Sequence, residues 1–532
     1  MKKIYNLIKL VIYKLEYISF NKKLFSKHNF ANKNKILVEF YMYNPSIISY
    51  ALFANTLSKK FNANIFTYIP KIKNPIINLM NIICNFLYWK VYQSFGCKKI
   101  IFPNNNYYKK KYFDMLKKKI NTKNDIINIK IKKIPIGDLI YDEYIRRHNI
   151  GTIDLDDPKF FYFLKEAIST FFFWETKLDK SVKSLVISHS VYFLGLPARI
   201  AIYKNIPVYN ISMSYVYYLS KKNILRCSGF KDYPKIFKKI KSKFKKNILQ
   251  QAEKEIFNKF LGKFDLTQIG STIDYKDINK IFNNKLKKKK LFVDKNKSNI
   301  LVASHCFTDA VHAHGDSIFL DFQEWFEFLI EYSKNKPNYN WYVKMHPAEF
   351  ERNKDILKKI LSENDNFILL PKNTSHNQII SSKIDVVLSV YGSVGYEYPF
   401  VNIPVINASY NGPHNGYDFN YHAQSKKNYK KLLNEIPIIK KKRLDKNVKL
   451  KISEYYFLRY MTNYHFLNNL DNVLLKLKQN YKSSMIFREF INKFNYNEFE
   501  NNNKYLTKFV ISKKNRIYSD NTKKVSKPVL FH

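Results

Sequence analysis

The sequence has little glycine, proline and cysteine for its length. Only 12 glycines and 17 prolines occur in 532 residues, which excludes collagen-like and low-complexity chains. The four cysteines are scattered and none forms a Cys-x-x-Cys pair, which excludes a disulfide framework and is typical of a reducing compartment. They are Cys84, Cys97, Cys227 and Cys306. Because 45% of the residues are hydrophobic, the chain is expected to fold into about two to four domains with real cores.

Acidic residues are also scarce. The chain has 42 Asp and Glu residues against 92 Lys and Arg residues, a formal net charge of +50. A surplus of this size can indicate a nucleic-acid partner. However, lysine is spread along the whole chain, and asparagine, isoleucine, tyrosine and phenylalanine are abundant with it, as an AT-rich coding bias would produce. Because no DNA-binding or RNA-binding motif is recognised either, we expect no nucleic-acid partner.

Long hydrophobic runs are missing as well. No stretch of about 20 apolar residues occurs, so no transmembrane helix is expected. The nearest run, Ile76 to Trp89, is interrupted by Asn78, Asn81 and Asn85 at helical spacing. That spacing predicts a buried helix instead.

Residues 1–30 contain a basic amphipathic helix without the small-residue cleavage site of a signal peptide. Its apolar residues recur at helical spacing: Ile4, Leu7, Ile8, Val11, Ile12 and Leu15. Two interpretations fit this pattern equally. The helix lies on the anionic surface of the inner membrane, or it docks on its own domain.

From residue 36 onward, strand and helix patterns alternate. Continuous apolar runs of strand length, such as residues 36–43 and 184–188, each precede a helical pattern, which predicts βαβ units with parallel sheets. A second series of this kind opens at residue 299. The sequence therefore predicts an α/β fold with two doubly wound, Rossmann-type domains that face a central cleft, with extra helical segments.

Five segments are expected along the chain. They are the amphipathic helix in residues 1–30, a Rossmann-like domain in 31–230, a basic helical linker in 231–296, a second Rossmann-like domain in 297–430, and a helical tail in 431–532.

The stretch Trp341-Tyr-Val-Lys344-Met-His346-Pro347 ends a predicted buried strand with two polar side chains. Pro347 stops the strand ladder, so Lys344 and His346 lie towards the carboxyl end of the strand. Both side chains can donate a hydrogen bond to a phosphate. A lone histidine at a strand end more often bonds to backbone, but a second motif follows.

That second motif runs from Asp385 to Glu397 and predicts a strand, a loop of small residues and a helix. Its glycines allow close backbone approach, its serines offer hydroxyls, and the helix start adds amide N–H groups, which together can cradle an anion. These residues are Ser389, Gly392, Ser393 and Gly395. Alternatively, they only shape a turn and Glu397 is a helix-start charge. We expect the ends of these two strands, as neighbours in one sheet, to converge on one pocket.

The two motifs carry a resemblance. The carrying residues are Val343-Lys-Met-His346-Pro347, Ser389-x-x-x-Ser393-x-x-x-Glu397 and Asn402-Ile-Pro404-Val-Ile. Over about residues 299–425 the chain resembles the carboxyl-terminal lobe of bacterial capsule polysaccharide biosynthesis proteins, the Kdo-transferase-like glycosyltransferases of GT-B architecture. It is similar, more distantly, to CDP-glycerol glycerophosphotransferases and bacterial sialyltransferases.

The resemblance implies a nucleotide-activated donor that is CMP- or CDP-linked and binds to the second Rossmann-like domain. It implies that His346, Ser389 and Ser393 bind the donor phosphate and that Glu397 lies near the ribose. Lys344 and Gly392 belong to the same implied donor site. The first Rossmann-like domain, residues 31–230, would then bind the acceptor.

A transferase also needs a base that takes the proton from the acceptor hydroxyl. The candidates are Asp138 and Asp142, in an acidic cluster of a basic protein, and His189, which directly follows the strand 184–188. Charges at a helix start are the alternative for the two aspartates. The acidic-residue-plus-Gly motif of the sialyltransferases has no clear counterpart, so the base cannot be carried over from the resemblance.

A polar loop follows the strand that begins at residue 299. It contains His305, Asp309, His312, His314 and Asp316. Imidazole and carboxylate groups can bind zinc, but no second His/Asp cluster is clearly paired with this loop. We therefore expect no metal and no cofactor beyond the donor, and contact of this loop with donor or acceptor.

Taken together, the sequence predicts a metal-independent GT-B glycosyltransferase that moves a sugar from a nucleotide-sugar donor to a surface polysaccharide or lipid-linked glycan. It is expected in the cytoplasm, with attachment to the inner membrane left open. A non-catalytic glycan- or nucleotide-binding protein and a metal-dependent hydrolase stay open as alternatives.

Overall fold

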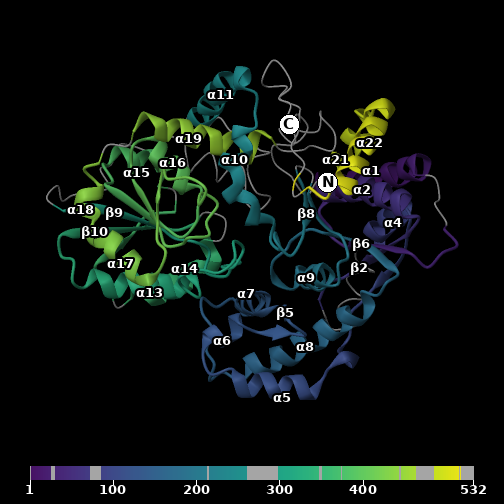
Figure 1. Cartoon of the computed structure of the whole chain (residues 1–532), viewed down its shortest axis with the longest axis horizontal. Coiled ribbons are helices and arrows are strands. Elements are labelled where there is room, and N and C mark those ends of the chain that lie inside the picture. Colours follow the sequence, from purple (N-terminus) through teal and green to yellow (C-terminus); the bar gives the residue numbers. More distant parts are fainter. Residues whose placement is uncertain are drawn as a thin grey trace. The chain divides into compact units, whose positions relative to one another are not determined.

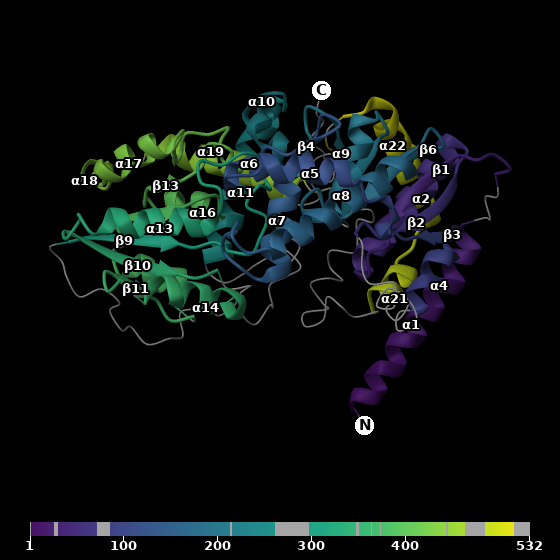
Figure 2. The same cartoon turned by 90° about the horizontal axis from the view of Figure 1, so that it is seen from below.

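The computed structural model describes residues 2–25, 30–71, 86–212, 215–260, 297–346, 350–362, 364–372, 374–442, 445–462, 485–514 and 516. The chain divides into two compact units. Unit 1 consists of the described residues within Met1–Glu143, Leu155–Arg226 and Asn463–Ser519, and unit 2 of those within Tyr144–Asp154 and Cys227–Thr462. Each unit is built on one six-stranded sheet, which can be followed in Figures 1 and 2.

The sheet of unit 1 has the strand order β3-β2-β1-β6-β7-β8. The strands are β1 (Lys35–Glu39), β2 (Asn64–Tyr68), β3 (Cys97–Ile101), β6 (Val182–Ile187), β7 (Val208–Ser212) and β8 (Tyr215–Leu219). All neighbouring pairs are parallel except β7 and β8. The first and fourth strands are therefore adjacent, with Val38 of β1 opposite Val186 of β6.

Helices cover both faces of this sheet (Figure 1), with α2 and its neighbours on one face and α8 and α9 on the other. The helices are α1 (Lys2–Leu24), α2 (Asn44–Phe61), α4 (Phe86–Ser94), α5 (Lys110–Lys119), α6 (Lys123–Ile127), α7 (Gly137–His148), α8 (Lys159–Lys177), α9 (Leu196–Tyr203), α21 (Met485–Asn492) and α22 (Tyr496–Ser512), with the 3₁₀ turns η1 (Asn105–Tyr107) and η2 (Tyr192–Leu194). A short hairpin joins β4 (Lys130–Ile131) to β5 (Ile134–Pro135).

The core of unit 1 includes residues from both ends of the chain. Tyr17 of α1 stacks on Phe487 of α21, with ring centroids 4.3 Å apart. Leu506 and Phe509 of α22 join the same cluster as the buried face of α2. Of the segment expected as a helical tail, residues 431–532, α21 and α22 thus belong to unit 1.

Unit 2 has the equivalent strand order, β11-β10-β9-β12-β13-β14, but all of its neighbouring pairs are parallel, including the last. The strands are β9 (Ser298–Ala303), β10 (Tyr339–Lys344), β11 (Phe367–Leu369), β12 (Val386–Ser389), β13 (Val405–Asn407) and β14 (Tyr421–His422). In Figure 1, α13 and α14 lie on one face of the sheet and α15 and α16 on the other. The helices are α10 (Tyr233–Lys238), α11 (Ser242–Phe260), α13 (Phe322–Ser333), α14 (Phe350–Leu361), α15 (His376–Ser381), α16 (Val394–Phe400), α17 (Lys426–Asn434), α18 (Ile436–Ile439) and α19 (Lys446–Tyr456), with the 3₁₀ turn η3 (Arg226–Asp232) and a π turn, η6 (Phe457–Met461).

The expected α/β class with two doubly wound, Rossmann-type sheets is confirmed, with one sheet in each compact unit. The expectation that β10 and β12 are neighbours is wrong, because β9 lies between them. The chain adds β10 and β11 on one side of β9 and then crosses back to place β12 on the other side.

Two further segments were expected to be helical. Within 231–296, the described residues form α10 and α11, and Ile248 and Ile256 of α11 belong to the same core cluster as Ile452 of α19. The helix expected over residues 76–89 lies outside the described residues up to 85, and α4 begins at Phe86.

Candidate functional site

At the point where the winding of unit 2 reverses, His305 bridges the carboxyl ends of β9 and β12. Its Nε2 accepts hydrogen bonds from the backbone N–H groups of Val390 and Tyr391 at 3.3 and 3.2 Å, and lies 3.2 Å from Ser389 Oγ. An accepting Nε2 carries no proton, so the ring is neutral with its proton on Nδ1. Consistently, burial and then the charge of His346 lower the pKa of His305 to about 3.

Lys344 and His346, at the end of β10, add positive charge to the same edge. Lys344 is buried and its Nζ donates to the carbonyl oxygen of Thr374 at 2.6 Å. Burial lowers the pKa of Lys344 to about 8, so its ammonium is still mostly charged at neutral pH. His346 is exposed, and its charge lowers the pKa of both His305 and His376. A charge at the end of β10 therefore acts on groups after β9 and at the start of α15.

Glu397, one turn into α16, is buried and already has a protein partner. Its Oε1 lies 2.5 Å from Nζ of Lys259 in α11. Burial alone would raise the pKa of Glu397. The charges of Lys259 and His376 and the hydrogen bonds from Lys259 and Ser393 outweigh burial, so the pKa is lowered. The carboxylate is therefore ionised and held in place from α11.

The six predicted donor-site residues thus divide by exposure. Ser389, Lys344 and Glu397 are buried. His346 and Ser393 are exposed and Gly392 is half-buried. The buried three bind protein groups. Solvent reaches the other three, although the Ser393 hydroxyl also donates to Glu397.

Gly392 and Gly395 meet different surroundings. A Cβ at residue 395 would lie 2.6 Å from the ring of His414 and 2.9 Å from Asn420 Nδ2. A Cβ at residue 392 would meet Ser389 Oγ at 3.3 Å and nothing closer. Gly395 therefore makes room for His414, whereas a side chain at residue 392 would press on Ser389 and contact His305, which line the edge described above.

In unit 1, the equivalent point between β1 and β6 holds a buried carboxylate that the sequence did not indicate. Glu39, the last residue of β1, accepts hydrogen bonds from Ser188 N at 2.6 Å and Ser188 Oγ at 2.8 Å. His189, a predicted catalytic residue, lies beside them, with Nδ1 2.8 Å from Ser188 Oγ. A single glutamate in the apolar run 36–43 was the only available signal.

The other two predicted catalytic residues lie on α7. Asp138 makes two hydrogen bonds to the buried guanidinium of Arg199, at 3.1 and 2.7 Å. Asp142 is 1% exposed. The Asp138 carboxylate is thus committed to a structural ion pair.

The polar loop after β9 contributes His305 to the edge just described, while Asp309 forms an ion pair with Arg146 at 3.6 Å. Within the described ranges, no three His, Cys, Asp or Glu side chains gather closely enough to hold a metal ion.

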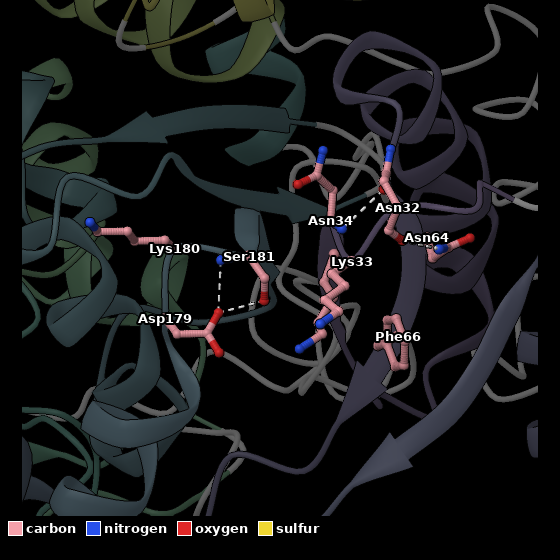
Figure 3. Close-up of a pocket in the computed structure, with 9 residues that line it drawn as sticks. Asn32, Lys33, Asn34, Asn64, Phe66, Asp179, Lys180 and Ser181 are labelled. Carbon is pink, nitrogen blue, oxygen red and sulfur yellow. Dashed lines mark hydrogen bonds between the residues drawn. The ribbon is translucent and has the colours of Figure 1, made fainter.

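A surface hollow of about 530 Å³ opens at the opposite edge of the unit 1 sheet (Figure 3). It is lined by Asn32, Lys33, Asn34, Lys35, Asn64, Phe66, Asp179, Lys180 and Ser181. Lys35 and Asn64 begin β1 and β2, so the hollow lies at the amino ends of the strands. Ligands of doubly wound sheets bind at the carboxyl ends, and we do not assign a function to this hollow.

Comparison with known proteins gives similarity only to solved structures, since no protein-family model and no curated protein matches the sequence. The S. aureus MnaA–UDP co-structure is 11% identical over 79% of this chain and 91% of its own, with a TM-score of 0.21. The wall teichoic acid polymerase TagF with CDPG is 12% identical over 94% and 97%, with a TM-score of 0.20. The glycotransferase of kitacinnamycin is 11% identical over 80% and 94%, with a TM-score of 0.23. At such scores these similarities carry no argument about this chain.

Gly395→Ala is expected to destabilise unit 2 by about 1–3 kcal/mol, because the added methyl group overlaps the His414 ring. Gly392→Ala, the matched control, should change stability by less than about 1 kcal/mol. Urea unfolding of both variants measures this difference. Equal stabilities would contradict the close approach of His414 to α16.

The burial of His414 predicts that the folded protein loses stability in acid. It is fully buried, and burial, followed by His422, His314 and Arg459, lowers its pKa well below 6.5. As the pH falls below 6.5 the unfolded chain takes up a proton that the folded chain does not, so this residue costs about 1.4 kcal/mol of stability per pH unit. In urea titrations at pH 7.5 and 5.5, His414→Phe should flatten this dependence. Replacement of the exposed His148 should not, and an unchanged slope in His414→Phe would show that the buried ring does not titrate in this way.

Proposed function

We propose that this chain is a glycosyltransferase that moves a sugar from a nucleotide-activated, CMP- or CDP-linked donor to a hydroxyl of a surface polysaccharide or lipid-linked glycan. One observation carries the proposal. His346, Gly392 and Ser393 reach solvent around His305 at the switch point of a doubly wound sheet, where such folds bind nucleotides.

The charges of this edge suit a phosphate. The Lys344 ammonium is buried and His346 is exposed, and burial lowers the pKa values of His305 and His376 to about 3, so both of these rings are neutral. A phosphate at His346 and Ser393 would receive hydrogen bonds from the imidazole and from the Ser393 hydroxyl, once that hydroxyl turns away from Glu397, whose charge Lys259 balances. Such groups would stabilise the charge that develops on the leaving nucleotide.

The motifs around His346 and Ser393 support the narrower assignment. They resemble those of capsule polysaccharide glycosyltransferases, whose donors are nucleotide-activated sugars. In this proposal Lys344, His346, Ser389, Gly392, Ser393 and Glu397 form the donor site, no resident metal takes part, and unit 1 binds the acceptor.

We further propose that the enzyme works in the cytoplasm on the surface of the inner membrane. Tyr13 and Tyr17 dock α1 on its own unit, whereas Ile8, Ile12 and Leu15, on another side, are 52%, 43% and 50% exposed. Figure 2 shows the amino-terminal end of α1 extending beyond α4 and α21. A helix with an exposed apolar stripe in a basic chain suits an anionic interface.

Within the described residues, none of the helices is both long and apolar enough to cross a bilayer.

The donor site can be tested by thermal shift with CMP, CDP, UDP and GDP. The wild-type protein should gain stability with a cytidine nucleotide, because a ligand that binds only the folded state raises its melting temperature. His346→Ala should weaken binding by about tenfold or more and abolish transfer, while His148→Ala, another exposed histidine, should behave like the wild type. Gly392→Ala should lose binding with its stability intact.

Full turnover by His346→Ala would refute the donor assignment. Nucleotide binding without transfer to any glycan would favour a binding protein instead, and loss of activity with a chelator would favour a metal-dependent hydrolase.

Membrane attachment can be tested with vesicles that contain anionic lipid. Ile8→Asp combined with Leu15→Asp should reduce co-sedimentation by about tenfold or more, because two apolar contacts with the interface are lost. Ile438→Asp with Ile511→Asp, which alters two other exposed isoleucines, is the control. Equal co-sedimentation of both double variants would rule out α1 as the anchor.

A further inference from the structure

Glu39 is an unusual carboxylate for a parallel sheet. It is 1% exposed, and among the described residues no lysine or arginine forms an ion pair with it. Four tyrosines have pKa values that are raised mainly by burial and also by the charge of Glu39. They are Tyr41, Tyr50, Tyr68 and Tyr92. A buried carboxylate without a cation is costly, and such groups concentrate at functional sites.

The hydrogen bonds of Glu39 lead directly to a histidine. Both carboxylate oxygens bind Ser188, one to its amide and one to its hydroxyl. Because Ser188 donates its hydroxyl proton to ionised Glu39, its oxygen is left to accept from Nδ1–H of His189, 2.8 Å away. The Tyr41 ring meets the imidazole edge-on, with centroids 5.8 Å apart, and helps to hold its plane. The chain of bonds fixes the tautomer of His189, with the proton on Nδ1 and the lone pair on Nε2.

We propose that Glu39 is a positioning residue that, through Ser188, makes His189 the base of the transfer reaction. This inference rests on the proposed function. The acceptor hydroxyl gives its proton to Nε2 of His189 while its oxygen forms a bond to the anomeric carbon of the donor. The bond from that carbon to the phosphate oxygen breaks, and its electron pair leaves with the nucleotide. The imidazolium, stabilised by Ser188 and Glu39, then releases its proton to water.

This arrangement also favours His189 over Asp138 as the base. Asp138 is committed to Arg199, whereas His189 follows a strand at the switch point of unit 1. A carboxylate that orients a histidine and stabilises its cation is the logic of the catalytic triad, here with a serine hydroxyl interposed.

The kinetic test compares Glu39→Gln and Ser188→Ala with Ser184→Ala. Ser184 is a buried serine of the same strand, with Oγ bonded to the carbonyl of Pro207 at 3.1 Å, and its loss should leave activity unchanged. Glu39→Gln and Ser188→Ala should lower kcat by about 100-fold or more at unchanged donor KM. Glu39→Asp, which keeps the charge, should retain more activity than Glu39→Gln.

A measurement of stability distinguishes a positioning role of Glu39 from a structural role. Burial raises the pKa of Glu39 to about 7, against the hydrogen bonds from Ser188. As the pH rises above 4.5 the unfolded chain loses this proton first, so ionised Glu39 lowers stability at pH 8. Glu39→Gln should therefore be at least as stable as the wild type at pH 8 while being far less active, a combination that a structural carboxylate would not give.

A second readout does not depend on turnover. In histidine-labelled protein, NMR should show His189 as the Nδ1–H tautomer, with its signal assigned by His189→Asn. Its pKa should fall by about one unit or more in Glu39→Gln and remain unchanged in Ser184→Ala. An unaltered His189 pKa together with wild-type kcat in Glu39→Gln would overturn the inference. Failure of the wild type to bind nucleotide would instead refute the proposed function, and the NMR result would still decide whether Glu39 controls His189.

Discussion

The reversal of winding direction between the first and fourth strands governs both units. In each sheet the chain builds outward from the first strand, returns across it, and then builds in the other direction. Because the two crossover helices at this point leave to opposite faces, neither covers the carboxyl ends of the central strands. A histidine and a serine hydrogen-bond to each other at each of these points, His189 with Ser188 in unit 1 and His305 with Ser389 in unit 2. The same backbone constraint thus creates two polar edges with different charge.

The charges at the two edges suit different chemical groups. Unit 2 surrounds its edge with Lys344, His346 and neutral histidines, and it balances its one nearby carboxylate, Glu397, with Lys259. Unit 1 places an unbalanced carboxylate, Glu39, behind a histidine. A positive edge suits a leaving phosphate and a negative one suits a base that must become a cation, so the charges of the two edges agree with the proposed division between donor and acceptor units.

The sequence was most informative where a property repeats locally. Strand-length apolar runs gave the α/β class, and the motifs around His346 and Ser393 gave residues that the structure places at one edge. Relations between distant segments were not predictable in this way. The position of β9 between β10 and β12 depends on a crossover, and Lys259 is one lysine among many in a basic segment. Glu39 was hidden in an apolar run because its partners, Ser188 and His189, lie about 150 residues further along the chain.

The contribution of α21 and α22 to unit 1 has a consequence for biosynthesis. The strands of unit 1 and all of the described strands of unit 2 leave the ribosome before Phe487 and Phe509, which complete the apolar cluster around α1 and α2. A nascent chain that stops earlier exposes that cluster to water, with the described residues of unit 2 already made. Unit 1 begins first and is finished last, so the period before its closing helices emerge is when the growing polypeptide most needs chaperone protection.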